Sequence, residues 1–271
     1  MDRTIGILDI LAANKTIKIS MLAELLNVSQ VTLRKDLDII EKRGIIQRTH
    51  GYVSLDDAHN IGKRLAINHS IKKRIAKAAA EIVEEGETVM IESGSCCTLF
   101  AEELALTRKN VTIITNSIFI VNYIYKPKDI KIILLGGLYQ PEAQVLFGPI
   151  TAKCGKLFYT DKFFLGADGY IPEHGFTDSD HLHAETVMEL AKYAKNVFVL
   201  TEAAKFQRRG TYSLIQLDKL SGVFTDENIP KEAEDTLIKN NVKLYKVPSV
   251  EKKIRWQQFP GQPPFLYTEE K

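Results

Sequence analysis

In the first 45 residues, apolar positions recur every three or four residues, which is the spacing of amphipathic helices. These positions are Ile5, Leu8 and Leu11, then Leu22, Leu25 and Leu26, then Leu33, Leu37 and Ile40. Ser29 is a candidate N-cap of the third helix, and Gly44 marks its end. Residues 45–53 predict two short strands that turn near His50-Gly51. Three helices followed by a hairpin predict a winged helix-turn-helix at residues 1–56.

From Ile71 onward the pattern changes to short apolar runs that alternate with helical stretches. The strand-like runs are 88–91, 111–115, 131–135, 163–167, 197–200, 222–225 and 242–247, and helices are expected at 98–106, 184–194 and 230–239. This alternation predicts an α/β fold: a Rossmann-like, mainly parallel sheet with helices on both faces. We place it at 73–247, after a linker at 57–72. Residues 248–271 hold four of the nine prolines and the only tryptophan, and predict a solvated or loosely docked tail.

The composition is that of a globular protein, with 45% hydrophobic and 26% charged residues in a chain of 271. The net charge of +2 excludes a protein that coats nucleic acid by bulk positive field, but it allows a local basic patch. No apolar run approaches the ~20 residues that span a bilayer, and no secretory signal is visible. Three cysteines are too few for a disulfide scaffold. We therefore expect a cytoplasmic protein with no membrane partner.

The third helix has the properties of a DNA reader. With its apolar stripe turned inward, Gln30, Thr32 and Arg34 are free to reach base edges or phosphates in the major groove. Arg48 and His50 on the hairpin would extend the contact to the DNA backbone or minor groove. The alternative is a protein-interaction domain in which Arg34 and Asp38, spaced i,i+4, form only a surface ion pair.

Small and polar residues follow three of the predicted strands. They are Ser93, Gly94, Ser95, Cys96, Cys97 and Thr98 after the first, Thr115 and Asn116 after the second, and Gly136 and Gly137 after the third. The carboxyl ends of parallel strands meet at one edge of the sheet, where a strand-to-helix turn can bind phosphate. We expect an anionic ligand in this crevice, although a tight turn also needs small residues when no ligand binds.

The stretch from Val28 to Leu37, followed by Arg48-Thr49-His50-Gly51, closely resembles the recognition helix and wing of the DeoR family of bacterial transcription regulators. Tyr52 stands where that family has a second glycine. The resemblance implies that Thr32, Arg34 and Lys35 bind operator double-stranded DNA. It further implies that Ser29 and Gln30 begin the helix and belong to its DNA-binding face.

The resemblance continues to about Val247, through a sensor domain similar in fold to ribose-5-phosphate isomerase. It implies that the 93–98 loop holds the phosphate of a sugar-phosphate effector, with Asp168, Glu185 and Lys205 near the sugar hydroxyls. Cys96 and Cys97 replace two threonines of the family, and thiols are weaker hydrogen-bond donors. The implied function is a repressor of a sugar-utilisation operon, a dimer or tetramer without a cofactor.

Three other interpretations are open at this stage. Cys96 and Cys97 suit redox or metal chemistry, and the histidines near Asp178 superficially resemble a metal cluster. We expect neither. The cysteines have no Cys-x-x-Cys pair or nearby histidine spacing, and we expect His174, His181 and His183 to line a solvated loop that leads into the helix at 184–194. The third is a sugar-phosphate isomerase with an accessory helix-turn-helix, in which Glu185, Asp168 and Lys205 would transfer protons. Ala167-Asp168-Gly169 offers a single carboxylate, so we expect no enzyme.

Overall fold

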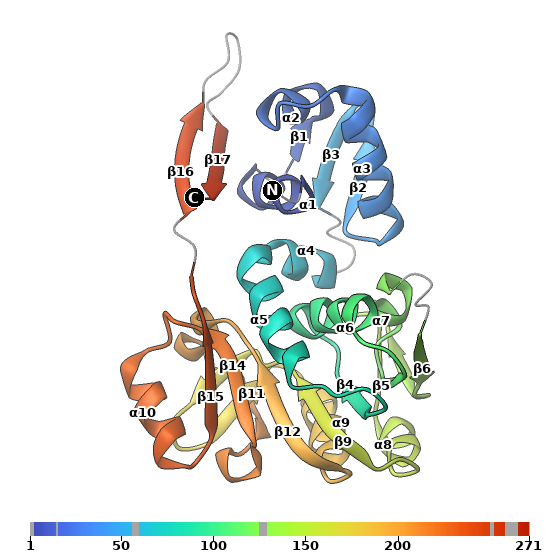
Figure 1. The fold of residues 1–271 in the computed structure, drawn as a ribbon, viewed down its shortest axis with the longest axis vertical. Helices are drawn as coiled ribbons and strands as arrows, with labels where there is room; N and C mark the ends of the chain where they lie inside the picture. The colour runs from blue at the N-terminus through green and yellow to red at the C-terminus, as the bar shows by residue number, and fades with distance from the viewer. Residues whose placement is uncertain are drawn as a thin grey trace. The chain divides into compact units, whose positions relative to one another are not determined.

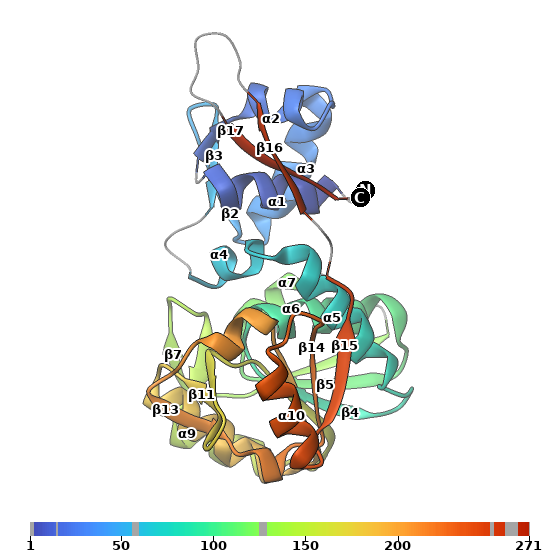
Figure 2. The same cartoon turned by 90° about the vertical axis from the view of Figure 1, so that its left-hand side faces the viewer.

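A computed structural model describes residues 3–14, 16–55, 60–124, 129–249, 252–257 and 265–270 (Figures 1 and 2). Chain contacts divide the protein into two compact units. One contains residues 1–70 together with 250–271, and the other contains residues 71–249. Among the described residues, no helix combines the length and apolar character needed to cross a membrane.

The first unit contains the expected winged helix-turn-helix (Figure 1). Its elements are α1 (Arg3–Asn14), β1 (Thr16–Lys18), α2 (Ile19–Leu25), α3 (Gln30–Lys42), β2 (Ile46–Thr49) and β3 (Tyr52–Leu55). The apolar stripe of α3, Leu33, Leu37 and Ile40, is buried as predicted. β2 and β3 form the wing, and β1 extends it to an antiparallel sheet of order β1-β3-β2.

The turn of the wing lies at His50-Gly51, where both residues have positive φ angles of 48° and 83°. Positive φ at both central positions is the geometry of the two-residue hairpin turn that matches strand twist. Glycine adopts it without steric cost, and His50 is one of only six non-glycine residues of the described chain with positive φ. The wing tip therefore forms although Tyr52 stands where a second glycine was expected.

Two stretches have more regular structure than the sequence pattern indicated. The expected linker contains α4 (Asn60–Ala66) and the start of α5 (His69–Glu81), while residues 56–59 lie outside the described part. The expected tail contains an antiparallel hairpin, β16 (Lys252–Gln257) with β17 (Phe265–Glu270), and β17 contacts α1. The prolines that suggested an irregular tail include Pro260, Pro263 and Pro264, which fall between the two strands.

The second unit is built on a seven-stranded parallel sheet, confirming the predicted α/β class. Its strands are β4 (Thr88–Ile91), β5 (Val111–Thr115), β6 (Ile130–Leu134), β9 (Thr160–Leu165), β12 (Ala194–Leu200), β14 (Gly222–Asp226) and β15 (Lys243–Val247). The order is β15-β14-β12-β9-β4-β5-β6 (Figure 1). The chain proceeds outward from β4 to β6, then returns to β9 and proceeds outward on the other side. The topological switch point therefore lies between β4 and β9, which pair directly.

Helices cover both faces of this sheet, as alternate residues of β9 show. The helices and short 3-10 turns of this unit, besides α5, are α6 (Ser95–Thr107), α7 (Ile118–Tyr123), α8 (Pro149–Gly155), α9 (His181–Ala191), η1 (Ala203–Gln207), η2 (Leu217–Lys219) and α10 (Lys231–Lys239). Phe163 belongs to a buried cluster with Val187 of α9, while the next residue, Phe164, packs against Phe100 of α6 with ring centroids 4.2 Å apart. Successive side chains of a strand point to opposite faces, so α9 and α6 lie on opposite sides of the sheet.

Two small antiparallel sheets lie outside the main sheet and were not predicted from the sequence. One pairs β7 (Leu138–Gln140) with β8 (Val145–Phe147), and the other has the order β10 (Gly169–Ile171), β11 (Gly175–Asp178), β13 (Tyr212–Ile215). These strands have three or four residues each, too few to establish a period in the sequence. β10 and β11 follow β9 directly and so stand near the switch point.

Candidate nucleic-acid interface and effector cleft

The amino terminus of α3 is fixed by a side-chain cap. The Ser29 hydroxyl accepts a hydrogen bond from the Thr32 backbone N–H at 3.1 Å and lies 2.9 Å from the Thr32 hydroxyl. This cap satisfies one of the N–H groups that the first turn of a helix leaves without a partner. Ser29 and Thr32, both predicted to contact DNA, are thus engaged in starting the helix.

The outer face of α3 presents Gln30, Arg34 and Lys35, which are all exposed, together with Val31, which is 65% exposed. Among the described residues, Arg34 and Lys35 have no ion-pair partner, and Asp38 pairs with Arg48 instead of Arg34. The surface ion pair that would have explained Arg34 without DNA is therefore not formed. The exposed face combines an amide, two cations and an apolar side chain, which suits base edges and phosphates.

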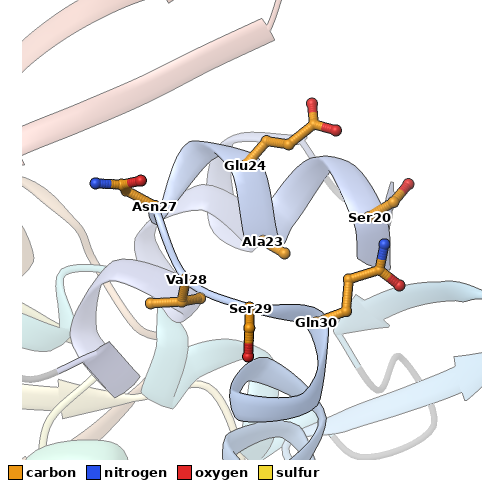
Figure 3. A pocket seen from close by; sticks show the side chains of 7 residues that line it. All are labelled: Ser20, Ala23, Glu24, Asn27, Val28, Ser29 and Gln30. Carbon is orange, nitrogen blue, oxygen red and sulfur yellow. The ribbon is translucent and has the colours of Figure 1, made fainter.

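A hollow of about 460 Å³ adjoins this face (Figure 3). It is lined by Ser20, Ala23, Glu24, Asn27, Val28, Ser29 and Gln30, which come from α2, the connecting turn and the start of α3. In Figure 3 the Gln30 amide points toward Ser20, while Ser29 points back onto its own helix. Gln30 and Ser20 thus border one concave surface at the helix-turn-helix.

Arg48 lies on β2, but its side chain is held against α3. Its Nε atom donates to the Glu41 carboxylate at 2.9 Å, its Nη2 atom donates to Asp38 at 2.6 Å, and its backbone N–H donates to Glu41 at 3.1 Å. These bonds join the wing to the recognition helix. His50, at the exposed tip of the wing, makes no such contact with α3 among the described residues.

In the second unit, Glu92 lies directly after β4 at the switch point and is only 2% exposed. Its Oε2 atom accepts the Gly166 backbone N–H at 3.0 Å, from the residue that follows β9. Its Oε1 atom accepts from the Ser93 hydroxyl at 2.5 Å and from Nε2 of His183 at 2.7 Å. One buried carboxylate therefore ties together the ends of β4 and β9 and the first turn of α9.

His183 lies between two carboxylates. Its Nδ1 atom is 2.8 Å from the Asp178 carboxylate, on the side opposite Glu92. Burial lowers the pKa of His183, but the negative charge of Glu92 and the hydrogen bonds to Asp178 and Glu92 outweigh burial and raise the pKa to about 10. The imidazole is therefore protonated at neutral pH and donates both ring N–H groups.

The positions of Ser93, His183 and Asp178 resemble a nucleophile, a base and an acid of a hydrolase, with Ser93 Oγ 3.4 Å from His183 Nε2. A general base needs a neutral ring nitrogen that can accept the proton of the nucleophile. Here Glu92 takes the bond to Nε2 and keeps the ring charged, so this array does not form an activated serine. Among the described residues, no group of histidine, cysteine and acidic side chains is placed to hold a metal ion.

The 93–98 loop runs from β4 into α6, and we call residues Ser93–Thr98 the anion loop. Gly94 is the N-cap of α6 with φ of 132°, a backbone conformation that favours glycine. The Thr98 hydroxyl donates to the Gly94 carbonyl at 2.8 Å, and the Cys97 thiol lies 3.9 Å from the Phe164 carbonyl oxygen. Cys96 and Cys97 are buried and form no disulfide. Ser95 is 7% exposed, and its side-chain hydroxyl makes no hydrogen bond among the described residues.

The next two strand ends carry the other predicted small and polar residues. The Thr115 hydroxyl accepts the Ser117 backbone N–H at 3.1 Å, and the Asn116 side-chain amide donates to the Leu146 carbonyl at 2.9 Å. The Asn116 side-chain oxygen is buried and has no hydrogen-bond partner among the described residues. The Gly136 carbonyl accepts from the Thr151 hydroxyl at 2.8 Å. Gly137 has no room for a side chain, because an added Cβ would lie 1.9 Å from that hydroxyl.

Of the three residues expected near sugar hydroxyls, Asp168 and Lys205 lie together and Glu185 lies apart. Lys205 Nζ is 3.5 Å from the Asp168 carboxylate, and the Asp168 backbone N–H donates to the Thr177 carbonyl, so these two residues belong to the switch-point region. Glu185 is exposed on α9 and lines a different hollow with Gly148, Pro149, Ala152, Thr186 and Glu189. Two residues along a helix turn the side chain by about 200°, so Glu185 faces away from the side on which His183 meets Glu92.

Glu92 is not among the residues predicted for this site, and from the sequence His183 is placed only in a metal cluster that we do not expect. The position of Glu92 at the end of a buried strand, before Gly94, is a signal that the sequence does contain. The pairing with His183 joins residues 91 positions apart. It arises from the sheet topology and has no local signal.

The two units together define a DNA-binding transcription regulator with an α/β sensor. Residues 3–59 match the family model of the DeoR-like helix-turn-helix domain, and residues 67–227 match that of the DeoR C terminal sensor domain. The chain belongs to the DeoR family of transcriptional regulators. This confirms the resemblance found in the sequence and the expectation of a regulator instead of an enzyme.

Similar proteins include the HTH-type transcriptional repressor GlcR of Bacillus subtilis, 29% identical over 90% of this chain and 95% of the relative. The glycerol-3-phosphate regulon repressor of Escherichia coli K12 is 25% identical over 88% of this chain and 96% of the relative. Among solved structures, ribose 5-phosphate isomerase A of Methanocaldococcus jannaschii has a TM-score of 0.38 and 19% identity, over 51% of this chain and 55% of that one. A likeness this low carries no argument about function.

Proposed function

We propose that this regulator represses a sugar-utilisation operon and that a phosphorylated sugar controls it by binding at the anion loop. The relatives include a repressor named for a phosphorylated metabolite, glycerol 3-phosphate. The observation that carries the effector site is the position of the anion loop at the switch point of the parallel sheet, where ligands of such sheets bind. The loop also leads into the amino terminus of α6, and the partial positive charge at the start of a helix favours a bound phosphate.

For the operator, we propose that Gln30, Arg34 and Lys35 contact DNA directly while Ser29 and Thr32 hold the start of α3. This proposal is supported by the exposure of all three side chains. Arg34 and Lys35 also have no ion-pair partner among the described residues. Arg48 is assigned to joining the wing to α3, because both carboxylates within its reach already bind it. His50 stays a candidate for a backbone or minor-groove contact at the wing tip.

The working form is a homo-oligomer, a dimer or tetramer, since paired recognition helices must reach successive major grooves about 34 Å apart. The second unit exposes large apolar side chains that suit self-association: Ile150 at 62%, Leu157 at 79% and Tyr159 at 72%. Sedimentation velocity measures the assembly directly. A monomer at operator-binding concentrations would contradict this part of the proposal.

The function is tested by titrating the full chain against DNA from its own upstream region, with and without a panel of sugar phosphates. We expect one sugar phosphate to change operator affinity roughly 5–150-fold, the usual range of allosteric coupling, and the same sugar without phosphate to have no effect. Binding of the panel compounds without any change in operator affinity would refute the proposed control. Turnover of a panel compound would instead revive the isomerase interpretation.

A further inference from the structure

A hydrogen-bonded cluster of Glu92, His183 and Asp178 contacts the anion loop through Ser93, and we call this cluster the support. The proposed function does not itself require it. Glu92 accepts from the hydroxyl of its neighbour Ser93 and from two segments that are distant in the sequence, through the Gly166 backbone N–H and the His183 ring. His183 is held in turn by Asp178 at 2.8 Å. The segment opposite the loop is fixed a second time, because the Asp168 N–H donates to the Thr177 carbonyl next to Asp178.

We propose that Glu92 and His183 are positioning residues that hold the anion loop in its binding conformation, with Asp178 fixing the imidazole from the other side. This inference rests on the proposed effector site. Neither Glu92 nor His183 is proposed to contact the effector. Their effect passes through Ser93, whose hydroxyl donates to Glu92 and which precedes the cap of α6.

The charges explain why the support needs a histidine. A carboxylate that is 2% exposed is costly unless a cation and hydrogen bonds compensate it. Asp178, at 6% exposure, is a second buried carboxylate, and a ring between the two that donates at both nitrogens satisfies each of them. Without the charged ring, Glu92 would lose its cation and would be driven to protonate or to turn away. Either change alters the acceptor that now fixes Ser93.

The support also explains the orientation of the first turn of α6. Gly94 takes an unusual backbone conformation immediately after Ser93, and the N–H groups of the first turn follow from it. A rotation at Ser93 would redirect these donors, and hydrogen bonds to an anion weaken steeply with misalignment. A phosphate held by this turn should therefore be sensitive to His183, which belongs to another helix.

The test uses the full chain and inorganic phosphate as the probe, with binding measured by calorimetry. We expect His183→Gln and Glu92→Gln to weaken phosphate binding roughly 10–100-fold, the effect of losing one charge-assisted hydrogen bond. His181→Gln is the matched control, because His181 is an exposed histidine of the same helix whose ring meets Tyr212. Urea unfolding of each variant, followed by circular dichroism, shows whether the second unit is folded under the conditions of the calorimetry.

A pH series separates positioning from simple packing. The groups that face the His183 ring are Glu92 at the end of β4 and Asp178 at the end of β11, and Asp180 accepts the His183 backbone N–H. Because Glu92 raises the pKa of His183, the ring of Glu92→Gln should lose its proton at a lower pH than in the unsubstituted chain. In that variant, phosphate affinity should fall reversibly over the pH range in which the ring deprotonates, and the side-chain nitrogen shifts of His183 in NMR report that range. The unsubstituted chain, in which the pKa of His183 is about 10, is the reference that corrects for the titration of phosphate itself. A ring that only fills space would produce no such coincidence.

The outcomes are distinct. If the unsubstituted chain binds no phosphate, the proposed effector site is wrong and this inference is wrong with it. If it binds phosphate and His183→Gln binds equally well, the effector site stands and the positioning role is refuted. If His183→Gln fails to fold, the pH series on Glu92→Gln decides, and phosphate affinity independent of His183 protonation refutes the role.

Discussion

Arg48 in the wing and Glu41 in the recognition helix form a two-point contact, in which both the backbone N–H and the guanidinium of Arg48 donate to one carboxylate. Asp38, one turn earlier on α3, accepts from the same guanidinium at 2.6 Å. The sequence interpretation assigned Arg48 to DNA because it is a cation in a wing. The structure gives that cation two partners within the protein, Asp38 and Glu41, which supports the proposal that Arg48 joins the wing to α3.

Replacing Glu41 with alanine distinguishes the two roles of Arg48. If Arg48 joins the wing to α3, Glu41→Ala should weaken operator binding, because the wing loses its anchor. If Arg48 binds phosphate, the same change frees a cation and removes a nearby negative charge, so affinity should rise. Fluorescence anisotropy with labelled operator gives the sign. Glu24→Ala, which removes an exposed carboxylate from α2, controls for the change in net charge.

Arg34 and Lys35 should differ in what they contribute to binding. Arg34→Ala is expected to cost about 1–3 kcal/mol and to relax preference at one base position, as loss of a bidentate base contact does. Lys35→Ala should weaken binding evenly across operator variants and reduce the slope of log K against log salt by about 1. Binding series at several salt concentrations on the operator and its single-base variants measure both effects. An affinity that does not depend on salt would contradict the cationic contacts altogether.

The sequence predicted all seven strands of the main sheet, and the signal is clearest for the inner strands because parallel strands buried on both faces are continuous apolar runs. Phe163 and Phe164 illustrate this, since their side chains pack on opposite faces of the sheet. The same rule cannot detect β10 or β11, whose few residues are defined by their pairing with each other. Short strands that depend on distant partners leave no period to count.

The residues of the candidate site also divide into those with a local signal in the sequence and those without one. Residues adjacent to a strand end, such as Gly94 and Asn116, were identified because their position follows from the strand itself. Glu92 and His183 come from β4 and α9, which only the order of the sheet and its covering helices bring together. Glu185 was named through the family resemblance, and the structure places it on the other side of α9 from His183. A resemblance transfers residue identities, whereas the direction of a side chain depends on helical phase.

Gly136 and Gly137 were both predicted to serve the effector, but only Gly137 is restricted by packing. An added Cβ at Gly137 would meet the Thr151 hydroxyl at 1.9 Å and the Phe147 backbone oxygen at 2.9 Å. At Gly136 the nearest atom is the Cys154 sulfur at 3.9 Å, an ordinary contact. Gly137→Ala should therefore destabilise the second unit by about 1–3 kcal/mol, the usual cost of overpacking, while Gly136→Ala should change stability by less than about 1 kcal/mol. Urea unfolding of both variants gives the comparison, and equal losses would contradict it.

The stability of the second unit should depend on pH through His183. The pKa of this ring is about 10 in the folded chain and about 6.5 in an unfolded one, so folding takes up a proton between these values. The stabilisation is complete below pH 6.5 and is lost as the pH rises through 10, so the free energy of unfolding falls across that interval. Since other groups also titrate there, the informative quantity is the difference between the unsubstituted chain and His183→Gln, measured by urea unfolding at pH 6.5 and 9.5. This difference should shrink at the higher pH, whereas His181→Gln should track the unsubstituted chain at both. A constant difference would show that His183 contributes only by packing and that its proton is not held by Glu92 and Asp178.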